Sequence, residues 1–326
     1  MTRARSLPRL LLLLVVLLAA AAAIGLACGP TLGWSDFVVE IRLTSVVLAA
    51  VVGAGLATTG AVLQAMSGNP LADPFVLGAS SGAAVGVVAS YWLGVGSGSP
   101  LVFVFASLGA FAAILAVLRI ARIGRRMPVQ TLLLAGITVS TLGSAVILLY
   151  FTLRPSQATT AMLFLMGSLQ ESRWRFIAMT AAVVVPCVLL GQVVARALNA
   201  FAMGESTARH LGVDVDRMKL AFCLLSAAMV GAIVAVSGLI GFVGLIVPHM
   251  ARRRVGNDHR LLLPACALGG ASFLILADAV ARTAAAPQTL SLGAITALCG
   301  GPYFLLLLRR RSAERDVVTP EPEPKP

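Results

Sequence analysis

The stretch SGLIGFVGLIVPHMARRRVGNDHR, residues 237–260, decides the fold because it fixes how often the chain crosses a membrane. Its apolar part, residues 238–251, is short for a full perpendicular span and contains Pro248. A basic run begins at Arg252, and an earlier basic segment ends at Lys219. Basic residues are held on the cytoplasmic side, so both segments lie on one side and an even number of crossings separates them. The short segment is therefore predicted to cross.

The composition places the whole chain in a membrane. Of its 326 residues, 59% are hydrophobic and only 12% are charged, which is more apolar side chain than one water-soluble core can bury. Ten stretches approach the length that spans a hydrocarbon layer about 30 Å thick. They are residues 8–28, 43–66, 75–94, 101–121, 128–152, 174–198, 219–237, 238–251, 261–281 and 290–309. We predict an all-α polytopic membrane protein of about ten transmembrane helices.

The charge distribution gives the orientation. A net charge of +12 would indicate nucleic-acid binding in a soluble protein, but in a membrane protein the positions of the charges matter first. If the N-terminus is inside, 20 of the 25 Lys and Arg residues fall on inside segments. Those segments are residues 1–9, 119–126, 196–219, 252–260 and 309–325. This asymmetry predicts that both the N- and C-termini are cytoplasmic, and it indicates no nucleic-acid partner.

The two ends of the chain are interpreted separately. Three arginines within residues 1–9 precede an apolar run, as in a secretory signal peptide, but the run at residues 10–28 is longer than the usual signal core. We expect an uncleaved first span. The Pro- and Glu-rich end predicts a disordered cytoplasmic tail at residues 311–326, after one transmembrane domain at residues 1–310.

The sequence contains a weak internal repeat at a shift of 178 residues. At this shift, seven residues of the second span and the corner after it align with identical residues of the seventh and eighth spans. All seven are Ala, Gly or Pro, and chance accounts for some of the matches in an Ala-rich chain. The first set is Ala49, Ala50, Gly53, Ala54, Ala57, Gly60 and Pro70. The second and seventh spans run in opposite directions, so the repeat is predicted to be inverted, as in many transporters.

One polar segment, FAMGESTARHLGVDVDRM at residues 201–218, is predicted to form two short helices around a turn. Glu205 suits a helix N-terminus, and Ala208 and Leu211 are predicted to share one face. Gly212 suits a left-handed C-terminal cap before the second turn at residues 213–218. Such an element either fits a groove on a soluble partner or is an ordinary amphipathic surface loop. The residues alone do not decide between the two.

A second polar segment, NPLADP from Asn69 to Pro74, interrupts two apolar runs. It contains Pro70, and Asp73 is placed to cap a helix that has proline at its first position. A structural corner is the favoured interpretation. The small residues 78–82 that follow allow either close helix packing, which we expect, or room along a pathway.

Isolated ionisable residues lie near several helix ends. Arg42 and Arg282, at the outer ends, would present positive charge to an acidic partner or extend to the interface. Asp278 lies four residues before Arg282, so a local ion pair is the simpler interpretation there. His249 has no second ligand nearby and is expected to be a hydrogen-bonded interface residue after Pro248.

The sequence lacks the residue patterns that several kinds of site require. The five cysteines show neither zinc-site nor disulfide spacing, so we predict no metal site and no cofactor. The only lysines are Lys219 and Lys325, and neither stands in a phosphate-binding loop, so the chain is not itself an ATPase and no catalytic residue is predicted. Asp73 and Asp278 are the only acids near the apolar parts of the spans, fewer than an ion-coupled carrier is expected to need.

Over nearly its whole length the sequence resembles the FecCD family, the permeases of ABC importers for iron-siderophores, haem and vitamin B12. Four long motifs carry the resemblance in the family's order. They are GAGLATTGAVLQAMSGNPLADPFVLGASSGAAVG (53–86), GESTARHLGV (204–213), SGLIGFVGLIVPHMARRRVGNDHRLLLPACALGGASFLILADAVAR (237–282) and LGAITALCGGPYFLLLLRR (292–310). The second and third motifs contain the polar segment around Glu205 and the short eighth stretch.

The resemblance implies a type II ABC importer permease that dimerises with a second copy or a paralogue. Two ATPase subunits would lie on the cytoplasmic side and a substrate-binding protein on the outer side. The coupling segment, residues 203–218, would dock on the ATPase through Gly204, Glu205, Ala208, Arg209, Leu211 and Gly212. Residues of the family motifs at gates or helix corners would be Asn69, Pro70, Asp73, Pro74, Gly241, Pro248 and His249.

The resemblance also implies that Arg42 and Arg282 meet acidic residues on the binding protein. Similar permeases commonly read Arg-Leu-Pro-Arg where this chain reads Arg42-Leu43-Thr44-Ser45, so one outer positive charge is missing. The span at residues 128–152 is similar to the helix that lines the central pathway at the dimer axis.

The expected function is therefore import of a metal chelate across the bacterial cytoplasmic membrane by a multi-pass permease, driven by a separate ATPase. Iron-siderophore is the expected cargo, ahead of haem and cobalamin. The internal repeat leaves an ion-coupled secondary transporter as the alternative, and a non-transporting membrane scaffold is the third class.

Overall fold

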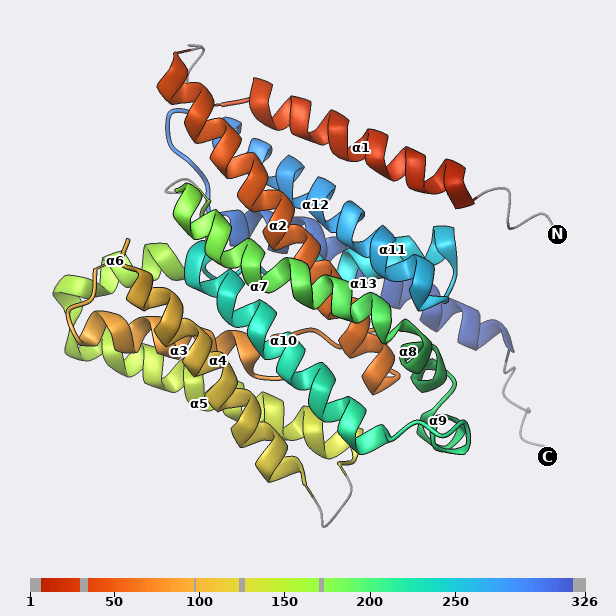
Figure 1. Ribbon diagram of the computed structural model, residues 1–326. Coiled ribbons are helices and arrows are strands. Elements are labelled where there is room, and N and C mark those ends of the chain that lie inside the picture. The colour runs from red at the N-terminus through yellow and green to blue at the C-terminus, as the bar shows by residue number, and fades with distance from the viewer. Residues whose placement is uncertain (1–6, 30–34, 97, 123–126, 170–172, 319–326) are drawn as a thin grey trace, which may run out of the picture.

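The computed structural model describes residues 7–29, 35–96, 98–122, 127–169 and 173–318, with side chains described between residues 12 and 306 of these ranges. All regular elements within them are α-helices, thirteen in number (Figure 1). They are α1 Leu7–Ala27, α2 Asp36–Ser67, α3 Ala79–Trp92, α4 Pro100–Ala121, α5 Val129–Leu153, α6 Pro155–Leu165, α7 Trp174–Val193, α8 Ala195–Ala202, α9 Glu205–His210, α10 Val215–Ser237, α11 Val243–Val255, α12 His259–Thr283 and α13 Leu292–Val318.

A helix occupies each of the ten predicted stretches, and α6 and α9 lie between them, whereas α8 begins inside the sixth stretch and ends beyond it. Six helices are long and apolar enough to cross a membrane: α2, α4, α5, α7, α10 and α12. Shorter apolar helices lie at Leu12–Ala27 and Leu292–Leu306 within α1 and α13. The helices α3 and α11 have 14 and 13 residues, so a count of ten crossings stays a prediction.

Three boundaries in the structure differ from the predicted ones. The third stretch begins as a helix at Ala79 rather than at residue 75, because Gly78 precedes it in a left-handed conformation with φ of 83°. The sixth stretch divides into α7 and α8 at Val194. Helix α13 continues to Val318, past the predicted start of the tail at residue 311, and residues 319–326 lie outside the described residues.

Helix α2 lies at the centre of the bundle. In its most apolar window 78% of the residues are buried, and it packs against α12, α11, α7 and α10. The crossing with α12 is close because Gly53 and Gly270 face each other; a Cβ built on Gly53 would lie 2.2 Å from the Gly270 carbonyl oxygen. Small residues at such crossings let two helix backbones approach in a membrane. The close packing that we expected at residues 78–82 is also present, because a Cβ on Gly82 would lie 2.5 Å from the Gly109 carbonyl oxygen.

The two helices that the predicted repeat relates have different main neighbours. Helix α2 makes its most extensive contacts with α12, while α10, its counterpart in the repeat, makes its most extensive contacts with α4. The inverted relation between the two stays a prediction.

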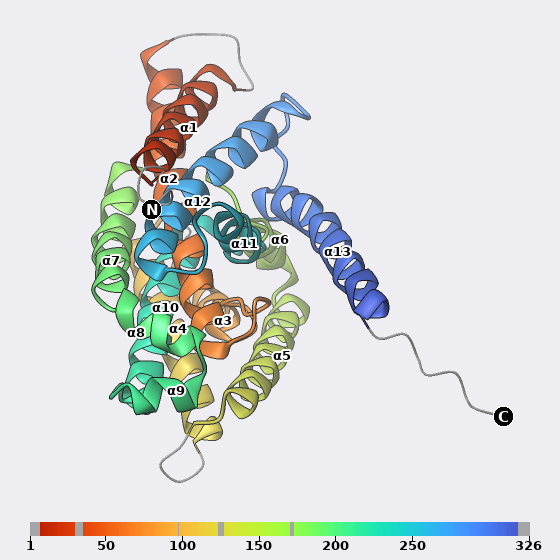
Figure 2. The same ribbon diagram turned by 90° about the vertical axis from the view of Figure 1, so that its right-hand side faces the viewer.

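Different segments of the chain lie at the two ends of the bundle. The start of α2 lies at one end and the short helix α9 at the opposite end (Figures 1 and 2). At the α9 end, Asn199 of α8 donates a hydrogen bond of 2.7 Å to Asp258, which caps α12. This contact places the basic loop before α12 beside the α8–α9 segment, on one side, as the charge argument predicts.

Helices α5 and α13 lie on the same side of the molecule (Figure 2). Only 17% of the residues in the most apolar window of α5 are buried, and its exposed side chains include Leu134, Leu142 and Leu149. This side therefore presents an apolar surface.

Candidate functional site

Helix α9 forms the core of the predicted coupling segment. Glu205 is its first residue, after Gly204 with φ of 104°, and Gly212 takes the left-handed conformation with φ of 82° just beyond its end. Both features agree with the sequence interpretation. The predicted common face was wrong, because Ala208 is fully buried whereas Leu211 is 61% exposed. The exposed Leu211 is available to a partner, while Ala208 fixes α9 to the bundle.

The second predicted short helix is instead the first part of the long helix α10. Asp214 caps α10 by accepting a hydrogen bond of 3.2 Å from the Arg217 backbone N–H. Helix α10 begins at Val215, four residues before the predicted start of the seventh span at Lys219, so the polar residues 215–218 belong to the same helix as that span. The polar segment is therefore continuous with α10.

Two ion pairs fasten α9 to α10. The Glu205 carboxylate lies 2.5 Å from the Lys219 ammonium, and the Arg209 guanidinium lies 2.8 Å from the Asp216 carboxylate. The hydrogen bond to Asp216 raises the pKa of Arg209 above its ordinary value. Each helix contributes one acidic and one basic residue to these two pairs.

The same two residues of α10 also hold the chain before α5. Lys219, which is only 1% exposed, donates a hydrogen bond of 2.6 Å from Nζ to the Met127 carbonyl oxygen. Asp216 accepts a bond of 3.2 Å from the Met127 N–H. The sequence interpretation counted Lys219 only as a basic charge and gave Asp216 no role. The sequence offers only an indirect signal, which is that Lys219 is the single lysine before the C-terminal tail of an Arg-rich chain.

The corner between α2 and α3 is built by local side-chain bonds. Asn69 Oδ1 accepts a hydrogen bond of 2.9 Å from the Leu71 N–H, and Asp73 Oδ1 accepts one of 2.9 Å from the Phe75 N–H. Asp73 and Pro74 thus start a turn and not the helix, which corrects the predicted cap. The segment forms turns between α2 and α3, and the role of its residues stays a prediction.

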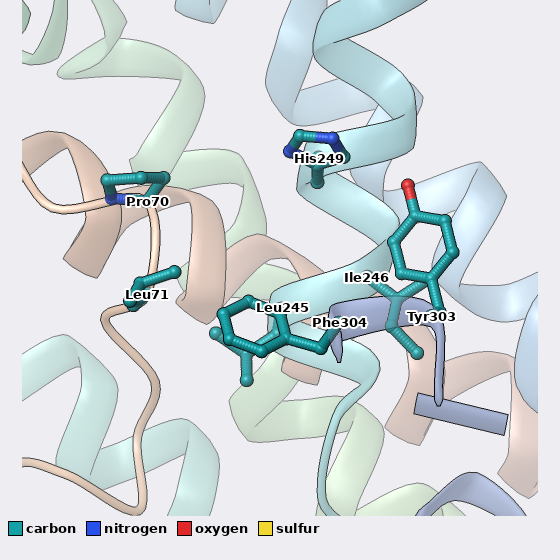
Figure 3. A pocket seen from close by; sticks show the side chains of 7 residues that line it. All are labelled: Pro70, Leu71, Leu245, Ile246, His249, Tyr303 and Phe304. Carbon is teal, nitrogen blue, oxygen red and sulfur yellow. The ribbon is translucent and has the colours of Figure 1, made fainter. Parts of the chain in front are cut away.

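The corner packs against α11, far away in the sequence. Pro70 and His249 line a small pocket together with Tyr303 of α13 (Figure 3). The His249 and Tyr303 rings meet edge to face, with centroids 6.0 Å apart. Pro248 is buried inside α11, one residue earlier. The family-motif residues of the second and eighth spans therefore form one contact region.

A larger cavity, of about 480 Å³, opens beside this contact region. Asp73, Phe75, Gly241 and Phe242 contribute to its wall, together with the start of α13. Part of the wall is non-helical backbone: the Leu239 N–H donates to the Leu165 carbonyl oxygen at 3.1 Å. Irregular backbone at membrane depth is tolerated where it lines a cavity or is covered by protein. The lining is predominantly apolar with Asp73 as its acidic group.

The two arginines expected at the outer surface are buried. Arg42 and Arg282 are each 3% exposed. Arg282 forms an ion pair of 2.9 Å with Asp278 and donates bonds to the Gly25 and Cys28 carbonyl oxygens, at 2.9 and 3.1 Å. Arg42 donates a bond of 3.1 Å to the Leu26 carbonyl oxygen. Both side chains therefore hold the C-terminal end of α1, where unpaired helix carbonyls favour cations. Their docking role stays a prediction.

Between the gaps in the described chain, no group of three His, Cys, Asp or Glu side chains is arranged to hold a metal ion.

Comparison with known proteins gives matches over most of the chain. The model of the FecCD transport family matches residues 10–310. The hemin transport system permease protein HmuU of Yersinia pestis is 44% identical over 284 residues, covering 85% of this chain and 84% of that protein. The cobalamin import system permease protein BtuC of Halobacterium salinarum is 46% identical over 278 residues, covering 83% and 73%.

Solved structures support the same assignment. An inward-facing conformation of a metal-chelate type ABC transporter matches with a TM-score of 0.85 and 31% identity, covering 93% of this chain and 99% of that one. PsaBC from Streptococcus pneumoniae shares the fold, with a TM-score of 0.60 and 17% identity over 82% of this chain and 90% of that one. The family match spans every motif that carries the sequence resemblance. This chain belongs to the FecCD transport family and is a multi-pass membrane permease.

Proposed function

We propose that this chain is the membrane-spanning subunit of an ABC importer that carries a metal chelate across the bacterial cytoplasmic membrane. The observation that carries the proposal is the position of α9, a short polar helix fixed by ion pairs at one end of the bundle, with Leu211 exposed beside it. An ATPase subunit would receive this element. The relatives named above, which are ABC-type permeases, support the same role.

The proposed mechanism is alternating access driven by the partner. ATP binding closes two ATPase subunits, α9 moves with the surface it docks on, and two permease subunits rock against each other to open the path inward. The sequence of this chain contains no phosphate-binding loop, so the ATPase subunits would supply the energy. This chain would supply the gated path. We place ten crossings and both termini on the cytoplasmic side in this assembly.

The proposed cargo class is a metal chelate. The named relatives import hemin and cobalamin, so a metal tetrapyrrole is the first class to test. An iron-siderophore, the cargo expected from the sequence, is also a metal chelate, and it stays a prediction. The apolar wall of the cavity suits a large organic chelate better than a hydrated ion.

The proposed partners are a second permease subunit, two ATPase subunits and an outer substrate-binding protein. The exposed apolar face of α5 is the surface we assign to the second permease copy or paralogue. Arg42 and Arg282 bind α1 carbonyls in this conformation. Docking of acidic residues on them would therefore require the end of α1 to move.

An ion-coupled secondary transporter is the less favoured function. The predicted inverted repeat favours this function, but an architecture alone does not indicate what drives transport. Coupling to an ion gradient needs ionisable groups in the pathway, and within the lining of the described cavity Asp73 is the one carboxylate.

The experiment is uptake into proteoliposomes that contain this permease with its genetically neighbouring ATPase and binding protein. Leu211→Glu places a charge on the exposed docking residue, so we expect at least a tenfold loss of uptake and of ATPase stimulation. Asn257→Glu, on an exposed loop at the same end, is the control and should transport normally. Uptake that persists without ATP and collapses with the ion gradient would instead establish the secondary transporter.

A further inference from the structure

The contacts of α9 lead to the start of α5 along two parallel routes. Glu205 binds Lys219 at 2.5 Å, and Lys219 binds the Met127 carbonyl oxygen at 2.6 Å. Arg209 binds Asp216 at 2.8 Å, and Asp216 binds the Met127 N–H at 3.2 Å. Both polar backbone groups of one residue are therefore held by side chains that are themselves held by α9.

The geometry of these routes favours the transfer of movement. Asp216 and Lys219 are three residues apart and share one face of α10. Lys219 is buried, so separating it from Glu205 would leave an ammonium group with too few partners, at a high free-energy cost. When α9 moves, the less costly response is for Lys219, Asp216 and Met127 to move with it.

The backbone after Met127 leads directly into α5 through a conformationally restricted residue. Pro128 is the N-cap of α5, with φ of −62°, and its ring fixes that angle. Helix α5 then contacts the cavity wall, because Ser140 Oγ donates a hydrogen bond of 2.9 Å to the Phe75 carbonyl oxygen. Phe75 lines the cavity described above. A continuous set of contacts thus joins α9 to the cavity through α5.

We propose that Lys219 and Asp216 form a strut that transmits the displacement of α9 to α5 and from there to the cavity wall. This proposal rests on the proposed docking of α9 on an ATPase. The two residues act as positioning residues: they contact neither cargo nor nucleotide, and they determine how much of each ATPase cycle reaches the pathway. Loss of the strut therefore uncouples ATP hydrolysis from transport.

The test compares Lys219→Met with Arg254→Met in the assembled transporter. Arg254 is an exposed basic residue outside the coupling segment, so its replacement is the control for loss of a positive charge. The readouts are ATPase co-purification with the permease, ATP hydrolysis and cargo transported per ATP. For Lys219→Met we expect wild-type co-purification, retained hydrolysis and at least a tenfold lower cargo-to-ATP ratio. Arg254→Met should match the wild type in all three.

A second variant covers the case in which Lys219→Met fails to fold. Asp216→Asn keeps a hydrogen-bonding side chain at a partly exposed position and is expected to lower the cargo-to-ATP ratio by severalfold. A wild-type ratio in either folded variant overturns the strut, as does a loss of transport that merely parallels a loss of co-purification. If the wild-type permease itself never binds the ATPase, the proposed function fails first, so the two failures are distinguishable.

Discussion

At the residue scale, Arg282 holds together two segments at opposite ends of the sequence. It pairs with Asp278 on its own helix and donates to two carbonyl oxygens at the end of α1. Arg282→Met would leave Asp278 buried without its cation and release the end of α1. Breaking a buried pair in this way costs about 3–5 kcal/mol. We expect a clearly lower thermal midpoint for purified Arg282→Met in detergent.

Two further variants separate the charge effect from a general loss of arginine. Arg254→Met, at an exposed position, should unfold at the wild-type temperature. The double variant Asp278→Leu with Arg282→Met removes both buried charges, so it should be more stable than Arg282→Met alone. A single variant as stable as the wild type would show that α1 is held without this pair.

The residue roles that sequence reasoning found are the local ones. The spacing of Asp278 and Arg282 predicts their ion pair, and Asn69 and Asp73 were recognised as corner residues, because these contacts depend on a few neighbouring positions. The binding of Met127 by Lys219 joins residues 92 positions apart. No spacing rule specifies such a contact, since it exists only after α5 and α10 have packed near each other.

At the element scale, the crossing of α2 and α12 depends on glycine. A Cβ on Gly53 would lie 2.2 Å from the Gly270 carbonyl oxygen, so Gly53→Val must push the helices apart. Overpacking of this kind costs about 1–3 kcal/mol or more. We expect a lower thermal midpoint and less folded protein in the membrane fraction. Gly301→Val, at a helical glycine with open space around it, is the control and should be tolerated; equal behaviour of the two variants would contradict the close crossing.

The helices themselves were largely predictable, whereas their ends were not. Long apolar runs such as residues 101–121 coincide closely with α4, because membrane helices need a fixed apolar length. The start of α3 was missed because Gly78 breaks the backbone within a continuous apolar run. The division of α7 from α8 at Val194 has no sequence signal, as no glycine or proline stands there.

At the scale of the whole molecule, the packing of distant segments gives the protein its function-bearing regions. The corner at Asn69–Pro74 and the family motif of α11 are far apart in sequence, and both line the same small pocket and cavity. Sequence reasoning identified both segments but not that they meet. They meet because α2, which leads into the corner, packs against α11.

The topology of the whole chain is tested by labelling introduced cysteines with a membrane-impermeant thiol reagent. Helix α12 has 25 residues, about 37 Å at 1.5 Å per residue, so its two ends lie on opposite sides of a bilayer. Cysteines would be placed at three exposed positions, Ser206, Asn257 and Gln288, after Cys28 and Cys299 are changed to serine. The reagent is added to spheroplasts, whose cytoplasmic membrane is intact and accessible from outside. We expect Gln288→Cys to react in these cells, and Ser206→Cys and Asn257→Cys to react only after permeabilisation. Labelling of Asn257→Cys from outside would place the basic loop on the wrong side of the membrane. The short helix α11 would then not cross, and the ten-crossing arrangement would fail with it.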